Sequence, residues 1–343
     1  MRDRTRATES RRARSEAAAR AQGPGWVLFF GMATLAAVAV CIGAESASDR
    51  RVALLVESSA SIYQQAALGF EKEFASAGQV QKLYLDEAQP GAEPKLEALR
   101  RDPPNLVVSI GTQAAKTARK NLPNVALLYC LALRPHENNL VGRNIGGIAL
   151  EIELSRQLDD IRKALPNVRR MGVVYDDLTS GARVEQAQQY LGSEVQLIRR
   201  VARTRQEATR AIQDLLSNAL SSEDAFWLLW DPVAANPTNF RQLVELSWRY
   251  KVPIIAPARP FVEAGALFSV EPNYRKAGEQ AGRLAQQVLK GELQLANVQA
   301  RPPQEIVITV NGGVEQRLGI SLPKNLRMEV LEPAQWRASA GAP

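Results

Sequence analysis

Short hydrophobic runs alternate with amphipathic stretches along the first half of the chain. The runs are RVALLVE (51–57), VQKLYLD (80–86), NLVVSIG (105–111) and VALLYCLAL (125–133). Helical spacing of apolar residues separates them, for example over 62–77 and 113–120. This alternation, with short polar loops, predicts parallel strands in a sheet that is covered by helices on both faces.

The same alternation restarts near residue 150 and continues to VPIIAP (252–257). A helix over 274–290 and a strand over 305–311 follow this second array, which is already complete without them. We therefore expect an α/β protein with two doubly wound, Rossmann-like lobes and a hinge. The expected division is 51–148 with 270–293 for lobe 1, 149–269 with 303–330 for lobe 2, and a flexible tail over 331–343.

The join between the two arrays is rich in glycine. The segment VGRNIGGIAL (141–150) holds Gly142, Gly146 and Gly147. Glycines suit a hinge crossing because they adopt backbone angles that other residues avoid. Simple turns are the other interpretation of this segment.

The first 44 residues have the form of an export signal. They carry seven arginines against three acidic residues, and the uncharged apolar run WVLFFGMATLAAVAV (26–40) follows them. This run suits a signal peptide and is short for a membrane span, so we expect cleavage after Ala44 and a periplasmic body. A retained inner-membrane anchor is the alternative, and Cys41 raises the further possibility of a lipoprotein.

Composition excludes several function classes. Only +3 of the net charge of +7 remains outside residues 1–44, which argues against a nucleic-acid partner. The single histidine, His136, and the two cysteines leave too few ligands for a structural zinc site and little basis for histidine catalysis. We therefore expect neither an enzyme nor a cofactor. Cys130 lies in an apolar run, which predicts a buried, inert thiol.

The chain resembles one known family in the order of its segments. The stretches NLVVSIGTQAAKTA, FWLLWDP and YKVPIIAP match it, and GALFSVEPNYRKAGEQAGRLAQQVLKGE with the later RLGISLP is the most specific. The family is that of ABC-transporter substrate-binding proteins related to tryptophan- and tyrosine-binding proteins. The resemblance implies the type I periplasmic binding protein fold, a small ligand held between two lobes, an ABC permease in the inner membrane as partner, and a monomer.

Ligands of open parallel sheets bind beyond the carboxyl ends of the strands, where helix N-termini offer free N–H groups. We expect a small organic or amino-acid-like ligand there, held by hydroxyl, carboxylate and guanidinium groups that follow the predicted strands. These candidate ligand-binding residues are Ser59, Ser61, Thr112, Asp177, Ser180, Asp231 and Arg259. Capping of the helices is the alternative role for the hydroxyls.

The chain departs from the family at three of these loops. It has Ser58-Ser59-Ala60-Ser61 where the aromatic-amino-acid binders carry a Glu-His-Pro type segment, Arg134-Pro135-His136 at the end of the fourth strand, and Pro257-Ala258-Arg259 after VPIIA. The arginines favour an anionic ligand. The departures also keep a second hypothesis open, namely an exported interaction or sensor protein with the same fold.

Overall fold

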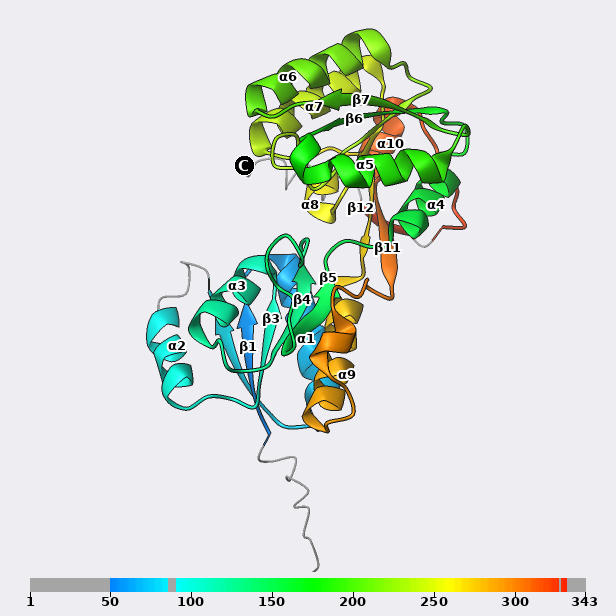
Figure 1. Ribbon diagram of the computed structural model, residues 1–343. Helices are drawn as coiled ribbons and strands as arrows, with labels where there is room; N and C mark the ends of the chain where they lie inside the picture. The colour runs from blue at the N-terminus through cyan, green and yellow to red at the C-terminus, as the bar shows by residue number, and fades with distance from the viewer. Residues whose placement is uncertain (1–49, 86–90, 327, 332–343) are drawn as a thin grey trace, which may run out of the picture. The chain divides into compact units, whose positions relative to one another are not determined.

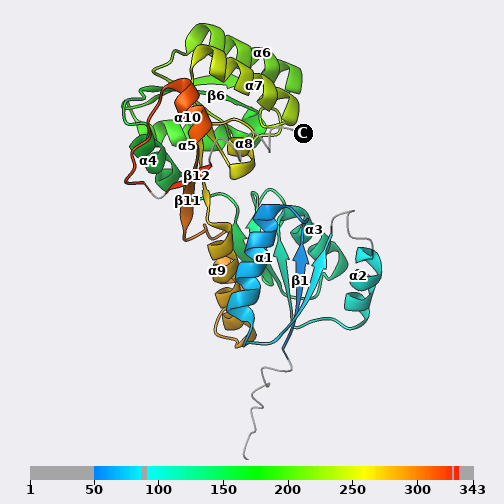
Figure 2. The ribbon, with the colours of Figure 1, turned by 180° about the vertical axis from the view of Figure 1, so that it is seen from behind.

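The structure is a computed structural model that describes residues 50–85, 91–326 and 328–331. The predicted leader (1–44) and nearly all of the predicted tail lie outside these residues. Figures 1 and 2 show two sheets, each with helices on its faces.

The first sheet has five parallel strands in the order β2-β1-β3-β4-β5. With helices α1, α2, α3 and α9 it forms what we call lobe 1. The bounds are β1 Arg51–Val56, α1 Ser61–Phe74, β2 Gln79–Tyr84, α2 Ala92–Arg101, β3 Leu106–Ile110, α3 Thr112–Asn121, β4 Leu127–Ala132, β5 Ile145–Ala149 and α9 Tyr274–Leu289.

The second sheet has seven strands in the order β12-β11-β10-β9-β8-β6-β7. With the helices on its faces it forms what we call lobe 2. The bounds are α4 Leu154–Ala164, β6 Arg170–Tyr175, α5 Asp177–Leu191, β7 Gln196–Val201, α6 Arg205–Asp214, a π-helical turn Leu215–Ala219, β8 Ala225–Trp227, α7 Pro237–Tyr250, β9 Ile254–Ala256, α8 Arg259–Glu263, β10 Phe268–Pro272, β11 Ile306–Asn311, α10 Gly312–Leu318 and β12 Met328–Leu331. A 3₁₀ turn, Leu295–Val298, belongs to the core of lobe 1.

Alternate residues of the central strands pack on opposite faces of their sheet, because side chains of a strand point to the two sides in turn. In β1, Val52 and Leu54 join the core formed with α1 and α9, whereas Ala53 and Leu55 join the core formed with α2 and α3. In the second sheet, α4, α5 and α10 cover one face and α6, α7 and α8 cover the other. Both sheets are therefore doubly wound.

Helix α9 packs against α1, although about 200 residues separate them in the chain. The two helices lie side by side in both views (Figures 1 and 2). Asn273 starts α9, since its side chain accepts a hydrogen bond from the Lys276 amide at 3.1 Å. The preceding residues 270–272, which we expected in lobe 1, form the end of β10 in the second sheet.

Strand β11, which follows the two alternating arrays, runs antiparallel to β10. The chain leaves the second sheet at the carboxyl end of β10 to form α9. It comes back at that same end, so the next strand must run in the opposite direction.

The glycine-rich join forms a turn after Gly142 and then strand β5. Gly146 and Gly147 lie within β5 at the edge of the first sheet. A Cβ at Gly147 would lie 1.9 Å from the carbonyl oxygen of Tyr129, and one at Gly146 would lie 2.2 Å from that of Leu295. These glycines therefore serve close packing of main chains around β5.

Candidate functional site

Polar residues gather where the strands of both sheets end. Glu57, Thr112 and Arg134 follow strands β1, β3 and β4 of lobe 1. Asp176 and Asp231 follow β6 and β8 of lobe 2. Six of the seven residues predicted to bind ligand lie in these loops or in the first turn of the helix that follows, and the seventh, Arg259, follows β9.

In lobe 1 the start of α3 is already capped by a carboxylate of the chain itself. Glu57 accepts hydrogen bonds from the amide of Gln113 at 2.6 Å and from the hydroxyl of Tyr63 at 3.0 Å. Gly111 makes room for this carboxylate, because a Cβ there would lie 2.4 Å from Glu57 Oε2. The N–H group that the sequence offered to a ligand at this helix is therefore already bonded.

The predicted hydroxyls of lobe 1 lie around this cap. Thr112 Oγ1 accepts a hydrogen bond from the amide of Leu133 at 2.9 Å, which ties β3 to the loop after β4. Ser59 and Ser61 are exposed, and Ser61 Oγ accepts a hydrogen bond from Gln65 Nε2 at 3.2 Å. Ser61 and Thr112 are the first residues of their helices.

In lobe 2 the structure brings two predicted residues together. The Ser180 hydroxyl donates to Asp231 Oδ2 at 2.7 Å, and both side chains are buried. Asp231 also accepts hydrogen bonds from the amides of Asp176 at 3.0 Å and Val233 at 3.0 Å. Three donors thus surround the carboxylate, as a buried charge requires.

The other two predicted residues of lobe 2 stand apart from this pair. Asp177 is exposed at the first position of α5. Arg259 donates to Glu263 and Glu329, each at 2.8 Å. Its amide donates to the buried carboxylate of Glu271 at 2.7 Å, and burial raises the pKa of Glu271. The Arg259 charge is therefore neutralised within its own lobe.

Arg134 joins the two lobes. It lies at the end of β4 in lobe 1, and its Nη2 donates to Ser180 Oγ at 3.1 Å and to the carbonyl oxygen of Trp230 at 2.7 Å in lobe 2. The Trp230 side chain in turn packs against the core of lobe 1. Arg134 was expected, as a departure from the family, to favour an anionic ligand, but it was not one of the seven predicted ligand-binding residues.

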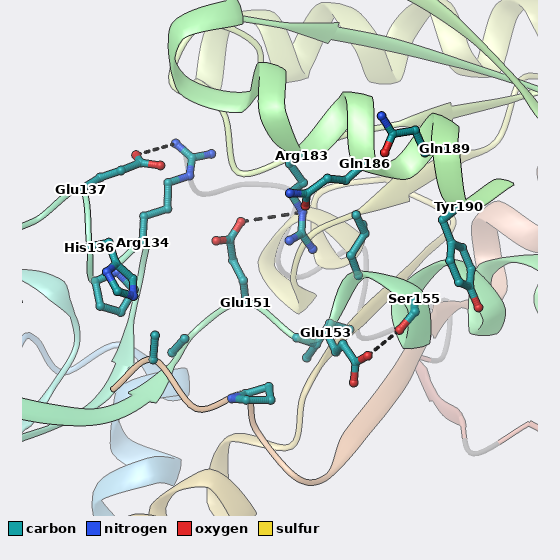
Figure 3. Close-up of a pocket in the computed structure, with 16 residues that line it drawn as sticks. Arg134, His136, Glu137, Glu151, Glu153, Ser155, Arg183, Gln186, Gln189 and Tyr190 are labelled. Carbon is teal, nitrogen blue, oxygen red and sulfur yellow. Dashed lines mark hydrogen bonds and ion pairs between the residues drawn. The ribbon is translucent and has the colours of Figure 1, made fainter. Parts of the chain in front are cut away.

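A hollow of about 900 Å³ lies beside this bridge. Its walls come from the loop after β4, the end of β5, the start of α4, helix α5 and the segment 300–302. Its polar lining residues, labelled in Figure 3, are Arg134, His136, Glu137, Glu151, Glu153, Ser155, Arg183, Gln186, Gln189 and Tyr190. We call this space the charged hollow.

Charges in the charged hollow are paired only loosely. Arg183 Nε lies 3.8 Å from Glu151, and Arg134 Nη1 lies 3.9 Å from Glu137, both beyond hydrogen-bond distance. Burial lowers the pKa of Arg183, the Glu151 carboxylate opposes that shift, and the nearby Arg134 charge adds to it. Arg183 Nη2 donates instead to the neutral Gln157 Oε1 at 2.8 Å. Both guanidinium groups thus have only neutral direct acceptors and can attract an anionic group of a bound molecule.

None of the seven predicted residues lines the charged hollow. Two of them reach it indirectly, because Ser180 and Asp231 hold the Arg134 side chain. Sequence reasoning missed Arg183, although it lies three residues after Ser180 on the same face of α5. It also missed Glu151, which carries no motif and is placed only by the turn after β5.

The family to which the chain belongs follows from a sequence comparison. Residues 78–333 match the model of the family described as ABC transporter substrate binding protein. The chain belongs to this family. Such substrate-binding proteins bind small-molecule ligands, interact with permeases and are typically extracellular or periplasmic. No helix within the described part of this substrate-binding protein is long and apolar enough to cross a membrane.

Individual relatives agree with the family and with the predicted resemblance. A tyrosine-binding protein of Clostridioides difficile is 24% identical over 200 residues, which are 56% of each chain. This substrate-binding protein thus spans about half the length of the curated relative that it matches.

Solved structures confirm the predicted type I periplasmic binding protein fold. The ligand-free, open structure of a substrate-binding protein with adhesive properties from Clostridium difficile is similar with a TM-score of 0.67, 18% identity and coverage of 82% of this chain and 99% of that one. The structure of an ABC domain in complex with L-Trp from Streptococcus pneumonia has a TM-score of 0.60, 21% identity and coverage of 83% and 100%.

Proposed function

We propose that the protein captures a small zwitterionic, amino-acid-like molecule in the charged hollow and delivers it to an ABC permease of the inner membrane. The observation that carries this proposal is the pair of arginines beside Glu151 in a space bordered by both lobes. A ligand carboxylate suits the guanidinium groups, and a ligand ammonium suits Glu151. The tyrosine-binding relative and the similar structure in complex with L-Trp support a ligand of this class.

The predicted residues keep a role in this proposal. Ser180 and Asp231 position Arg134 at one end of the space. Ser59, Ser61 and Thr112 follow strands β1 and β3 of lobe 1, and Asp177 follows β6 of lobe 2, where closure of the lobes would bring them to a bound ligand. Of the predicted residues, Arg259 has the weakest case for a contact with the ligand, since two carboxylates of lobe 2 already pair with it. The proposal places the protein in the periplasm, as a monomer sent there by its leader.

Isothermal titration calorimetry with a panel of L-amino acids tests the proposal. We expect binding of at least one amino acid, and its loss when the carboxylate is amidated or the ammonium acetylated. Arg183→Gln removes the half-buried guanidinium and should weaken binding at least tenfold, because a hydrogen bond to a charged group is worth about 1.5–3 kcal/mol.

Arg199→Gln is the matched control. Arg199 is also an arginine of lobe 2 with a carboxylate partner, Glu185 at 2.9 Å, but it lies on strand β7 outside the charged hollow. Its replacement should leave binding unchanged. Equal binding by the Arg183 variant and the wild type would place the ligand elsewhere.

One observation favours a second candidate function, an interaction or sensor protein without transport. The side chain of Arg134 fills the space between Ser180 and Trp230. If no amino acid or small organic acid binds to the wild type in the same titrations, this second function becomes the better supported one.

A further inference from the structure

The loop that carries Arg134 is fixed in place. Its backbone has a φ of 42°, in the left-handed region that arginine rarely adopts. Asn138 Nδ2 donates to the carbonyl oxygens of Leu133 at 2.8 Å and Arg134 at 3.3 Å. The amide of Leu140 donates to the carbonyl oxygen of Pro135 at 2.7 Å. The guanidinium is therefore aimed at lobe 2 by a backbone that hydrogen bonds hold in an unfavourable conformation.

The groups that receive this guanidinium form an acceptor site for a cation. The Ser180 hydroxyl uses its proton for Asp231, so its lone pairs face Arg134. The carbonyl oxygen of Trp230 is the second acceptor, at 2.7 Å. The negative charge of Asp231 lies directly behind the hydroxyl and favours a positive charge in front of it.

Arg134 is held by these acceptors more weakly than a structural arginine would be. Arg170 shows the contrast, because it donates to both carboxylate oxygens of Asp224 at 3.1 and 2.6 Å. The side chain of Arg134 is only 11% exposed, yet within the described residues no carboxylate lies within hydrogen-bond distance of it. A largely buried cation that has only neutral direct acceptors can be exchanged for another cation.

We propose that the guanidinium of Arg134 is an internal occupant of a cation subsite formed by Ser180 Oγ and the Trp230 carbonyl oxygen, and that the cationic group of the ligand replaces it there. The proposal rests on the proposed function and refines it, because the ligand cation goes to this subsite while Glu151 stays beside Arg183. Released from lobe 2, Arg134 lies next to Arg183 and donates to the ligand carboxylate. Arg134 thus blocks the subsite in the ligand-free protein and contributes to binding once the ligand is present.

Methylguanidinium is the probe for the vacated subsite. Arg134→Gly removes the side chain and keeps the loop, since glycine adopts a positive φ without strain. We expect this variant to bind methylguanidinium, and a concentration tenfold above its Kd should raise Tm by about 3–6 °C. The wild type should show no rise, because methylguanidinium has no carboxylate to receive a released Arg134, which therefore keeps the subsite.

Three further variants complete the test. Arg134→Gly combined with Ser180→Ala should lose the rise, because one acceptor is gone and the Asp231 charge has no hydroxyl in front of it. Arg119→Gly, at an exposed arginine of α3, should behave like the wild type. Arg134→Asn serves in place of the glycine variant should that variant fail to fold, as asparagine also tolerates a positive φ.

The outcomes separate this inference from the proposed function. A folded Arg134 variant that shows no response to methylguanidinium, or one whose response survives Ser180→Ala, overturns the inference. Binding of amino acids by the wild type is measured independently and decides the proposed function, whatever methylguanidinium does.

Discussion

A methyl group added at Gly278 tests the return of α9 to lobe 1. A Cβ at this position would lie 1.9 Å from the carbonyl oxygen of Ala66 and 2.9 Å from the amide nitrogen of Phe70, both on α1. These are main-chain atoms and cannot rotate away. The two helices must therefore separate by about 1.5 Å to restore ordinary contact distances.

The expected loss of stability follows from two opposing effects. Overpacking of this kind costs about 1–3 kcal/mol. Alanine gains about 1 kcal/mol over glycine in a helix interior. Gly181→Ala, in the middle of α5, has the same gain, and its new Cβ meets only the Asp177 carboxylate, an exposed side chain that can move. The difference between the two variants is therefore the overpacking cost, about 1–3 kcal/mol.

Thermal unfolding followed by circular dichroism measures this difference. Each kcal/mol should lower Tm by about 2–4 °C in a domain of 150–250 residues. Hydrogen exchange of the α1 amides adds a local measurement, since exchange should rise in α1 when α9 moves away. Equal Tm values for Gly278→Ala and Gly181→Ala would refute the close contact of the two helices.

Two further predictions concern groups inside the lobes. Cys130, in a Cys41→Ser background, should not react with a disulfide reagent at pH 8 until denaturant is added. Burial raises the pKa of its thiol to about 12, so about one thiol in ten thousand is ionised at that pH. Rapid labelling of the native protein would contradict its burial. Asp224→Ala should lower the free energy of unfolding by about 1–3 kcal/mol in urea denaturation, because its buried carboxylate accepts hydrogen bonds from Arg170 and from the amide and hydroxyl of Ser221. Asp214→Ala, which removes an exposed partner of Arg200, is the control, and an equal loss in both variants would argue against the buried pair.

The order of strands and helices could be predicted because the core strands are continuous apolar runs. Val52 to Val56 are all buried, and so are Leu106 to Ile110. The strand β5 escaped prediction, since Gly146 and Gly147 replace the branched side chains that mark a strand. Helix α10 and strand β12 are short and carry too few apolar residues to produce a period.

Only those parts of the candidate site that lie directly after predicted strands could be predicted from the sequence. The loops after β6 and β8 were expected to meet, and Ser180 and Asp231 do bond to each other. That Arg134 reaches them depends on a left-handed backbone, which the residue type itself disfavours. Arg183 and Glu151 meet because a turn and a helix place them together, and no local pattern records that distance.

The route of the chain through both lobes affects the order in which the protein can be completed during synthesis. Tyr274, Ala277 and Ala281 of α9 belong to the same apolar core as Val52 and Phe70. Helix α9 is synthesised only after β6 to β10, so one face of α1 in lobe 1 stays uncovered until then. Domains made of one continuous segment can fold as soon as they emerge. Here the N-terminal part of lobe 1 is synthesised first but is completed only when α9 is added. A chain that ends before residue 274 lacks the helix that packs on α1.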